Sequence, residues 1–125
     1  MSHQDPLVGR VIGGRYRLEE RLGEGGFGEV YKATHLVLGT PVAVKLTRQD
    51  RPDLLARFRR EALAQERLEV RFVVRVRDFG REPDGLHYLV QNFVDGPTLL
   101  DVINRRGVVE PARAVELCRQ ICIAL

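Results

Sequence analysis

Alternating apolar and charged residues near the start of the chain predict two strands. Tyr16 and Leu18 alternate with charged residues as far as Leu22, which is the period of a strand that buries one face. Residues 29–34 combine β-branched and aromatic side chains without a helical period, so we expect the chain to fold back as a second strand. The cluster of glycines between these two runs would therefore connect the strands of a hairpin.

A third strand is expected after a Gly-Thr-Pro turn. Successive side chains of a strand point to opposite faces, so Val42, Val44 and Leu46 would share one face. Ala43 and Lys45 would share the other face. Lys45 is a marked choice in this chain, because 18 of its 20 basic residues are arginine.

The hydrophobic period becomes helical between residues 53 and 68. The apolar stripe of this predicted helix contains Leu54, Phe58, Glu61, Gln65 and Leu68. Glu61 is the one charge in the stripe, and a buried carboxylate without a partner is strongly destabilising. We expect Lys45, on the inner face of the third strand, to be that partner.

A second hairpin and two helices are predicted in the rest of the chain. Strand-like runs at residues 72–79 and 86–91 flank a Pro-Asp-Gly turn. Thr98 and Asp101 have the spacing of a capping box that opens a short helix, and Pro111 suits the first turn of a last helix. The apolar face of that last helix would contain Val115, Cys118, Cys122 and Leu125. We expect both cysteines to be small buried hydrophobes.

Composition and charge exclude several classes of protein. The 125 residues are 44% hydrophobic and 30% charged, which is typical of one globular domain at most. There is no secretory signal and no run near the ~20 apolar residues of a membrane span, so we expect a cytoplasmic protein without a membrane contact in this segment. The net charge is +3, but the basic residues are scattered, which argues against a nucleic-acid partner. No Cys or His spacing suggests a metal site.

The last five residues, 121–125, are all apolar, and no capping Gly or Asn follows them. Domains rarely end in this way. We therefore expect the sequence to be part of a longer protein, in preference to a small domain that buries its end against a partner.

The glycine cluster, Gly23-x-Gly25-x-x-Gly28, is a weak signal without its context. A dinucleotide-binding loop would open a helix, whereas this one opens a strand, and a P-loop needs a closing Gly-Lys-Ser/Thr that is absent. A glycine hairpin can hold phosphates through its backbone N–H groups if a cation shares the charge, and Lys45 would supply it. The alternative is a plain hairpin with Lys45 and Glu61 both exposed to water. That alternative would not explain why the glycines, Lys45 and Glu61 occur in this order on two strands and a helix.

These features together resemble eukaryotic-type protein kinases, especially bacterial Ser/Thr kinases. Gly23-Glu-Gly-Gly-Phe-Gly28-Glu-Val30 with Val42-Ala-Val-Lys45 is similar to the glycine-rich loop and third-strand lysine of that family. Phe58-Arg-Arg-Glu61 resembles the start of its C-helix, and Tyr88-Leu-Val-Gln-Asn-Phe-Val-Asp-Gly96 resembles its last strand and hinge. The resemblance extends over residues 16–125.

The resemblance implies an ATP site in which Lys45 holds the α- and β-phosphates and Glu61 orients Lys45. The glycine loop would cover the phosphates, Gln91 would be the gatekeeper, and the backbone at Asn92 and Val94 would bind the adenine edge. Leu22, Val30 and Ala43 would enclose the adenine. The full set implied is Leu22, Gly23, Glu24, Gly25, Gly26, Phe27, Gly28, Glu29, Val30, Ala43, Lys45, Gln91, Asn92 and Val94.

The implied fold is α+β. A kinase N-lobe with a five-stranded antiparallel sheet and one C-helix is expected at residues 16–91, after an N-terminal extension at 1–15. A hinge at 92–97 and two helices of an incomplete C-lobe at 98–125 would follow. Relatives usually have His-Pro where this chain has Val70-Arg71, and Met-Glu where it has Gln91-Asn92.

The function implied for the parent protein is transfer of the ATP γ-phosphate to protein Ser/Thr hydroxyls. The catalytic base and the Mg²⁺ ligands of the family would follow Leu125. A pseudokinase or regulatory binding module without catalysis is the alternative, suggested by Gln91-Asn92. A dinucleotide-dependent enzyme would instead require a helix that begins near Gly28.

Overall fold

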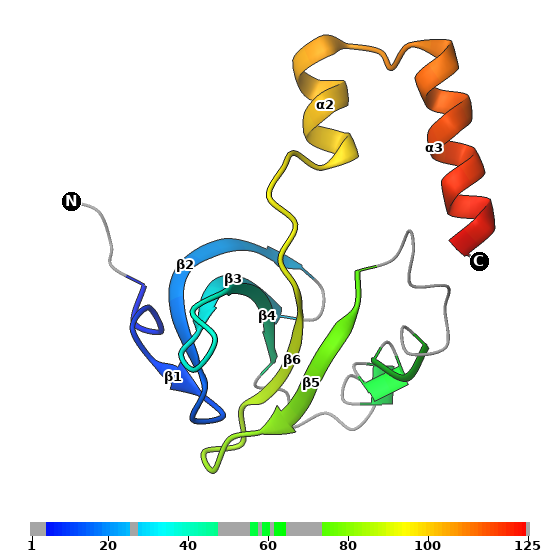
Figure 1. Ribbon diagram of the computed structural model, residues 1–125. Helices are drawn as coiled ribbons and strands as arrows, with labels where there is room; N and C mark the ends of the chain where they lie inside the picture. Colours follow the sequence, from blue (N-terminus) through cyan, green and yellow to red (C-terminus); the bar gives the residue numbers. More distant parts are fainter. Residues whose placement is uncertain are drawn as a thin grey trace.

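The computed structural model describes residues 5–25, 28–47, 56–57, 59–60, 62–64 and 74–124. Its centre is a strongly curled antiparallel sheet (Figure 1). The six strands are β1 (Val11–Ile12), β2 (Tyr16–Gly25), β3 (Gly28–His35), β4 (Pro41–Thr47), β5 (Val76–Arg81) and β6 (His87–Asn92). They lie side by side in the order β1-β2-β3-β4-β6-β5. Because the chain after the glycines is strand β3, the helix required by a dinucleotide-binding loop is excluded.

The sheet has one strand more than the five expected from the sequence. The additional strand is β1, in which Val11 pairs with Arg17 and Ile12 with Tyr16. Two residues are too few to show a period of two, so the pattern could not predict this strand. The expected N-terminal extension thus contributes Ile12, which is fully buried, to the core.

The core lies on the face that the curl encloses. On β4 the expected alternation is confirmed, since Val42, Val44 and Leu46 are buried whereas Ala43 and Lys45 are only half-buried. The core cluster contains Ile12, Tyr16, Leu18, Tyr31, Ala33, Val42, Val44, Leu46, Leu86, Tyr88 and Val90. The cluster extends from β1, the first strand in the sheet order, to β6, the fifth. The curl must therefore bring the two ends of the sheet towards each other.

Three polar contacts connect those two ends. The Tyr16 hydroxyl donates a hydrogen bond to Asp78 on β5 over 2.9 Å. Burial is the main reason that the pKa of Tyr16 is raised to about 12, and the hydrogen bond to Asp78 adds to the effect. Nearby, the Gly13 amide donates to Glu82 over 2.8 Å, and Arg10 forms an ion pair with Asp84 at 3.0 Å.

The helix expected at residues 53–68 is confirmed where the structure describes it, because residues 56–57, 59–60 and 62–64 are helical. Ala62 is buried there and packs against Leu89 of β6 and Val76 of β5. Leu89 does not belong to the core cluster inside the curl, so this helix covers a different side of the sheet. The Val70-Arg71 departure lies outside the described residues.

Helix α2 (Leu99–Arg106) begins with the expected capping box. The Asp101 amide donates to the Thr98 hydroxyl, the Thr98 amide donates to the Asp101 carboxylate, and both distances are 3.0 Å. These hydrogen bonds hold the pKa of Asp101 below its usual value. The helix ends at Arg106 and is capped by Gly107, whose φ of 80° favours a glycine.

Helix α3 (Pro111–Ala124) begins at the expected proline. Cys118 and Cys122 are exposed, so the expectation that both are buried is wrong. Val115 on the same helix is 69% exposed, because no described segment packs on the face that these residues share. None of the described helices is long and apolar enough to span a lipid bilayer.

Candidate functional site

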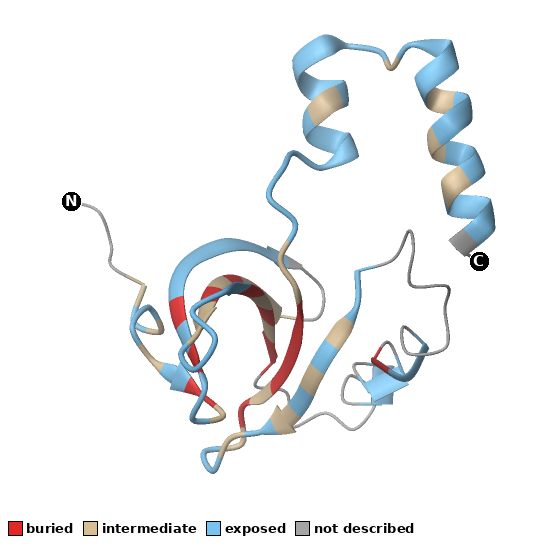
Figure 2. Cartoon of the chain, in the orientation of Figure 1, coloured by how far each residue is buried: buried red, intermediate tan, exposed pale blue. Residues whose placement is uncertain are grey.

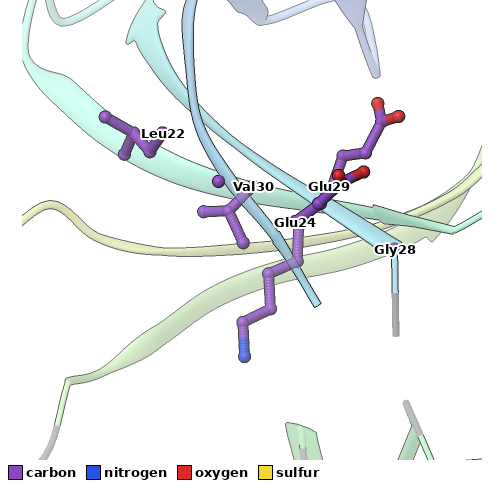
Figure 3. A pocket seen from close by; sticks show the side chains of 7 residues that line it. Leu22, Glu24, Gly28, Glu29 and Val30 are labelled. Atoms are coloured by element: carbon purple, nitrogen blue, oxygen red, sulfur yellow. The ribbon is translucent and has the colours of Figure 1, made fainter. Parts of the chain in front are cut away.

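A cavity of about 330 Å³ opens between strands β2, β3 and β4 (Figure 3). Its lining residues are Leu22, Gly23, Glu24, Gly28, Glu29, Val30 and Lys45. Every one belongs to the set that the sequence predicts. The structure therefore brings the described glycine-loop residues and the third-strand lysine to one place.

Irregular pairing of β2 with β3 explains how Leu22 reaches this cavity. Arg21 pairs with Tyr31, and Gly23 pairs with Val30, the next residue along β3, so Leu22 is the additional residue of a β-bulge. Leu22 is 46% exposed, unlike Tyr16 and Leu18 of the same strand, which are buried. Alternation along the sequence cannot reveal such a change of direction.

Gly28 and Gly23 meet different surroundings. Gly28 has a φ of +127°, and a Cβ at this position would come within 1.9 Å of the Leu46 carbonyl oxygen on β4. Only glycine fits between the two strands there. Among the described residues, no atom lies within 4 Å of a Cβ placed on Gly23, so these residues leave open space there beside the cavity. Gly25 pairs with Gly28 at the end of the hairpin, and Gly26 and Phe27 lie outside the described residues.

Lys45 lies on the β4 face opposite the core. Its strand neighbours are Val30 on β3 and Leu89 on β6. Leu89 in turn packs on Ala62, the helical residue that follows Glu61 in the sequence. Glu61 itself lies outside the described residues, so its ion pair with Lys45 stays a prediction.

Two carboxylates line the cavity on the side away from Leu22 and Val30 (Figure 3). Arg21 forms ion pairs with both, with Glu24 in a close contact and with Glu29 at 3.6 Å. Glu29 also accepts a hydrogen bond of 2.9 Å from the Tyr31 hydroxyl. The negative charge beside the cavity is thus partly neutralised and held in place.

The expected adenine-binding residues lie on β4, β6 and the segment after β6. Ala43 pairs with Gln91, which is 7% exposed, and Val42 pairs with Asn92. The Asn92 amide donates to the Arg75 carbonyl over 3.0 Å. Val94 is 65% exposed. Ala43, Gln91, Asn92 and Val94 do not line the cavity of the glycine loop. Gln91 nevertheless lies on the strand next to that of Lys45, where it pairs with Ala43.

The sequence did not indicate the contacts of three further residues, Asp5, Tyr31 and Lys32. Tyr31, which is fully buried, donates to Asp5 and to Glu29, and burial raises its pKa well above the usual value. No pattern in the sequence predicts the bond from Tyr31 to Asp5, because these residues are 26 positions apart. Lys32 places its Nζ 4.9 Å from the centre of the Phe93 ring. The rarity of lysine, which marked Lys45, could also have marked Lys32.

The donor set of this site fits a polyphosphate. Backbone without side chains borders the cavity at Gly23 and Gly28, a lysine lies on its sheet face, and apolar side chains flank it at Leu22 and Val30. A flat, partly apolar group with a charged tail meets both kinds of surface. The arrangement can bind and orient such a ligand, and Lys45 can share its charge.

The comparisons with known proteins agree with this geometry. The model of the protein kinase domain matches residues 16–125. Serine/threonine-protein kinase PrkC of Bacillus subtilis is 35% identical over 122 residues, 95% of this chain and 19% of the relative. Serine/threonine-protein kinase PknH of Mycobacterium bovis is 42% identical over 125 residues, 98% of this chain and 21% of the relative. Serine/threonine-protein kinase PknB of Mycolicibacterium smegmatis is 43% identical over 117 residues, 89% of this chain and 19% of the relative.

The chain spans about a fifth of the length of these curated relatives. The family match includes the cavity, the β5–β6 hairpin, and helices α2 and α3. The glycine hairpin, the position of Lys45 and the match over most of the sequence lead to one conclusion: this chain belongs to the protein kinase domain family.

Proposed function

We propose that the protein with this chain is a serine/threonine kinase, which transfers the γ-phosphoryl group of ATP to protein hydroxyls. In this proposal the chain supplies the nucleotide-binding residues. The observation that carries the proposal is Lys45 on the sheet face of a cavity bordered by Gly23 and Gly28. Relatives of this chain are named serine/threonine-protein kinases, which agrees with protein serine and threonine hydroxyls as the substrate class.

Phosphoryl transfer depends on positioning and on charge neutralisation more than on covalent chemistry. The backbone amides of residues 23–28 would donate hydrogen bonds to the phosphates. Lys45 would contact the α- and β-phosphate oxygens and offset part of their charge. Leu22, Val30 and Ala43 would pack on the adenine, with Gln91 behind it.

Glu61 would hold the Lys45 ammonium in place through an ion pair. The packing of the neighbouring Ala62 on Leu89 supports this role, because Leu89 is the strand partner of Lys45. The Asn92 carbonyl and the Val94 amide would bind the adenine edge. The bond from the Asn92 amide to Arg75 supports the choice of the carbonyl as the ligand-binding group at residue 92.

Mg²⁺ would accompany the ATP. In this proposal its ligands are those of the catalytic half of the kinase domain, as the family resemblance implies. We propose a cytoplasmic location, where ATP is available. We also propose a division into a nucleotide lobe at residues 16–91, a hinge at 92–97 and the start of a second lobe at 98–125.

Substitution of Lys45 tests the proposal. In the full-length protein, Lys45→Met should lower ATP affinity and reduce phosphate transfer to a protein substrate by at least about a hundredfold, since the phosphates lose their positioned cation. Transfer is measured with radiolabelled ATP, and thermal melting controls for folding. Lys45→Arg is the matched control, which keeps the charge but changes its geometry and should restore binding better than transfer.

Unchanged transfer by the Lys45→Met variant would contradict the role of this lysine. A wild-type protein that binds ATP but transfers no phosphate to any protein would contradict the kinase activity and leave nucleotide binding in place.

A further inference from the structure

Two contacts hold the end of β6 and the residue that follows it. The first is made by Lys32 of β3, whose Nζ lies 4.9 Å from the centre of the Phe93 ring. This distance is within the range of a cation–π interaction. Strand β4 lies between β3 and β6, so the lysine must reach across it. The residue of β4 beside Lys32 is Ala43, whose small side chain leaves room for this contact.

The second contact comes from β5, on the other side of β6. Arg77 donates a hydrogen bond from Nη1 to the Asn92 side-chain oxygen over 3.0 Å. Val76 pairs with Gln91 and Asp78 with Val90, so Arg77 is the additional residue of a β-bulge. The Asn92 amide also donates to the Arg75 carbonyl. Residues 92 and 93 are therefore held from the strands on both sides of β6.

The chain's use of lysine supports a defined role for Lys32. Lys32 and Lys45 are its only lysines, against 18 arginines. Val30 is the strand partner of Lys45, and Lys32 follows two residues later on the same face of β3. Both lysines thus lie on the sheet face that carries the site. Lys45 belongs to the phosphate end, whereas Lys32 contacts the aromatic residue of the hinge.

We propose that Lys32 and Arg77 are positioning residues that fix the hinge for binding of a nucleobase. Residues 92 and 94 would bind the base through their backbone, and Phe93 lies between them. Fixing Phe93 and the Asn92 side chain sets the direction of both backbone groups before the ligand arrives, which lowers the entropy cost of binding. This inference rests on the proposed nucleotide site, and it assigns Lys32 to the base and not to the phosphates.

Adenosine and ATP distinguish the two roles of a lysine at this site. Adenosine has the base but no phosphate, so its affinity depends on the hinge. The affinities of both ligands are measured by calorimetry on the full-length protein and on its Lys32→Met variant. We expect both affinities to fall by the same factor, about two- to fivefold, which is the range for one partly exposed cation–π contact. The Lys45→Met substitution should lower the affinity for ATP but not the affinity for adenosine.

Further variants make the test specific to the contact. Phe93→Leu should cause the same loss as Lys32→Met, and the double variant should lose no more than either single one, because both remove one interaction. Lys32→Arg should retain affinity, since arginine also binds an aromatic face. The Arg77→Gln substitution should lower the affinity for adenosine as well. Thermal melting verifies that each variant is folded.

The outcomes separate the two proposals. A loss of ATP affinity without a loss of adenosine affinity would show that Lys32 is a phosphate contact and overturn the inference. Equal affinities of wild type and Lys32→Met for both ligands would overturn it too. If the wild type binds neither ligand, the proposed nucleotide site itself is wrong, and the inference falls with it.

Discussion

Gly23 and Gly28 belong to the same motif, but at the scale of single residues they meet different requirements. Gly28 combines a positive φ with a close approach to the Leu46 carbonyl, so the fold itself needs it. Gly23 has open space beside it and lines the cavity, so a ligand is what would exclude a side chain there. In the proposed site, the motif would thus contain one glycine that the hairpin requires and one that the ligand requires.

Alanine substitutions should separate these two requirements. Gly28→Ala should lower the free energy of unfolding by about 1–3 kcal/mol, the usual cost of a residue forced into unfavourable backbone angles. Gly23→Ala should leave the melting temperature nearly unchanged and reduce ATP affinity, because its methyl group would enter the space proposed for the phosphates. Thermal unfolding and ATP titration of both variants provide the measurements. Equal destabilisation by the two substitutions would contradict this division.

At the scale of elements, the segment before β1 is attached to strand β3 through one tyrosine. The Asp5 carboxylate accepts hydrogen bonds from the Tyr31 hydroxyl and from the Leu7 amide. These bonds, with the charge of Arg21, hold the pKa of Asp5 below its usual value of 3.8. The Tyr31 hydroxyl also donates to Glu29, which lines the cavity. The N-terminal segment and the glycine hairpin therefore share one buried hydroxyl group.

A dependence on pH follows from this attachment. Because the pKa of Asp5 is depressed in the folded state, its stabilising effect is complete above the unfolded value of 3.8 and is lost as pH falls through the lower folded value. The Gly9 amide donates to the Leu18 carbonyl, and its protection against hydrogen exchange, relative to the intrinsic rate at each pH, should decrease in that acidic window. Asp5→Asn is the control, since it keeps the size of the side chain together with the neighbouring Glu29 and Arg21. If it shows the same acid-induced exchange as wild type, Asp5 is not the responsible group.

The elements that the sequence predicts well are those in which local chemistry decides the structure. The alternation of β4, the capping box of Thr98 and Asp101, and the start of α3 at Pro111 all depend on neighbouring residues. Features that depend on distant partners escaped prediction. The two-residue strand β1, the bulge at Leu22 and the contact of Lys32 with Phe93 each require the curl of the sheet, and no local pattern encodes it.

At the scale of the whole molecule, burial is uneven. The sheet encloses its core, whereas α2 has no buried residue and α3 exposes large apolar side chains (Figure 2). Val115 is 69% exposed and Ile121 53% exposed. The exposed cysteines of α3 have the same origin: they lie on a helix that no described segment covers. Exposed apolar side chains of this kind promote association.

We therefore expect residues 1–125 to self-associate when expressed alone. The double substitution Val115→Gln and Ile121→Gln should increase the soluble monomer several-fold without changing the stability of the sheet, because it removes apolar surface and no core contact. Light scattering coupled to size-exclusion chromatography measures the monomer. Arg113→Gln, on the same helix, is the matched control and should have no such effect. A wild-type chain that is already monomeric and melts cooperatively would refute the expectation.

In the proposed function, the cavity between β2, β3 and β4 binds ATP, with Lys45 on its phosphates. The most direct test is a crystal structure of the full-length protein with a non-hydrolysable ATP analogue. We predict the triphosphate beneath residues 23–28, the Lys45 ammonium within hydrogen-bond distance of a phosphate oxygen, and the base against Val30 and Ala43. An analogue bound elsewhere, or a Lys45 that does not contact it, would contradict the proposed ATP site.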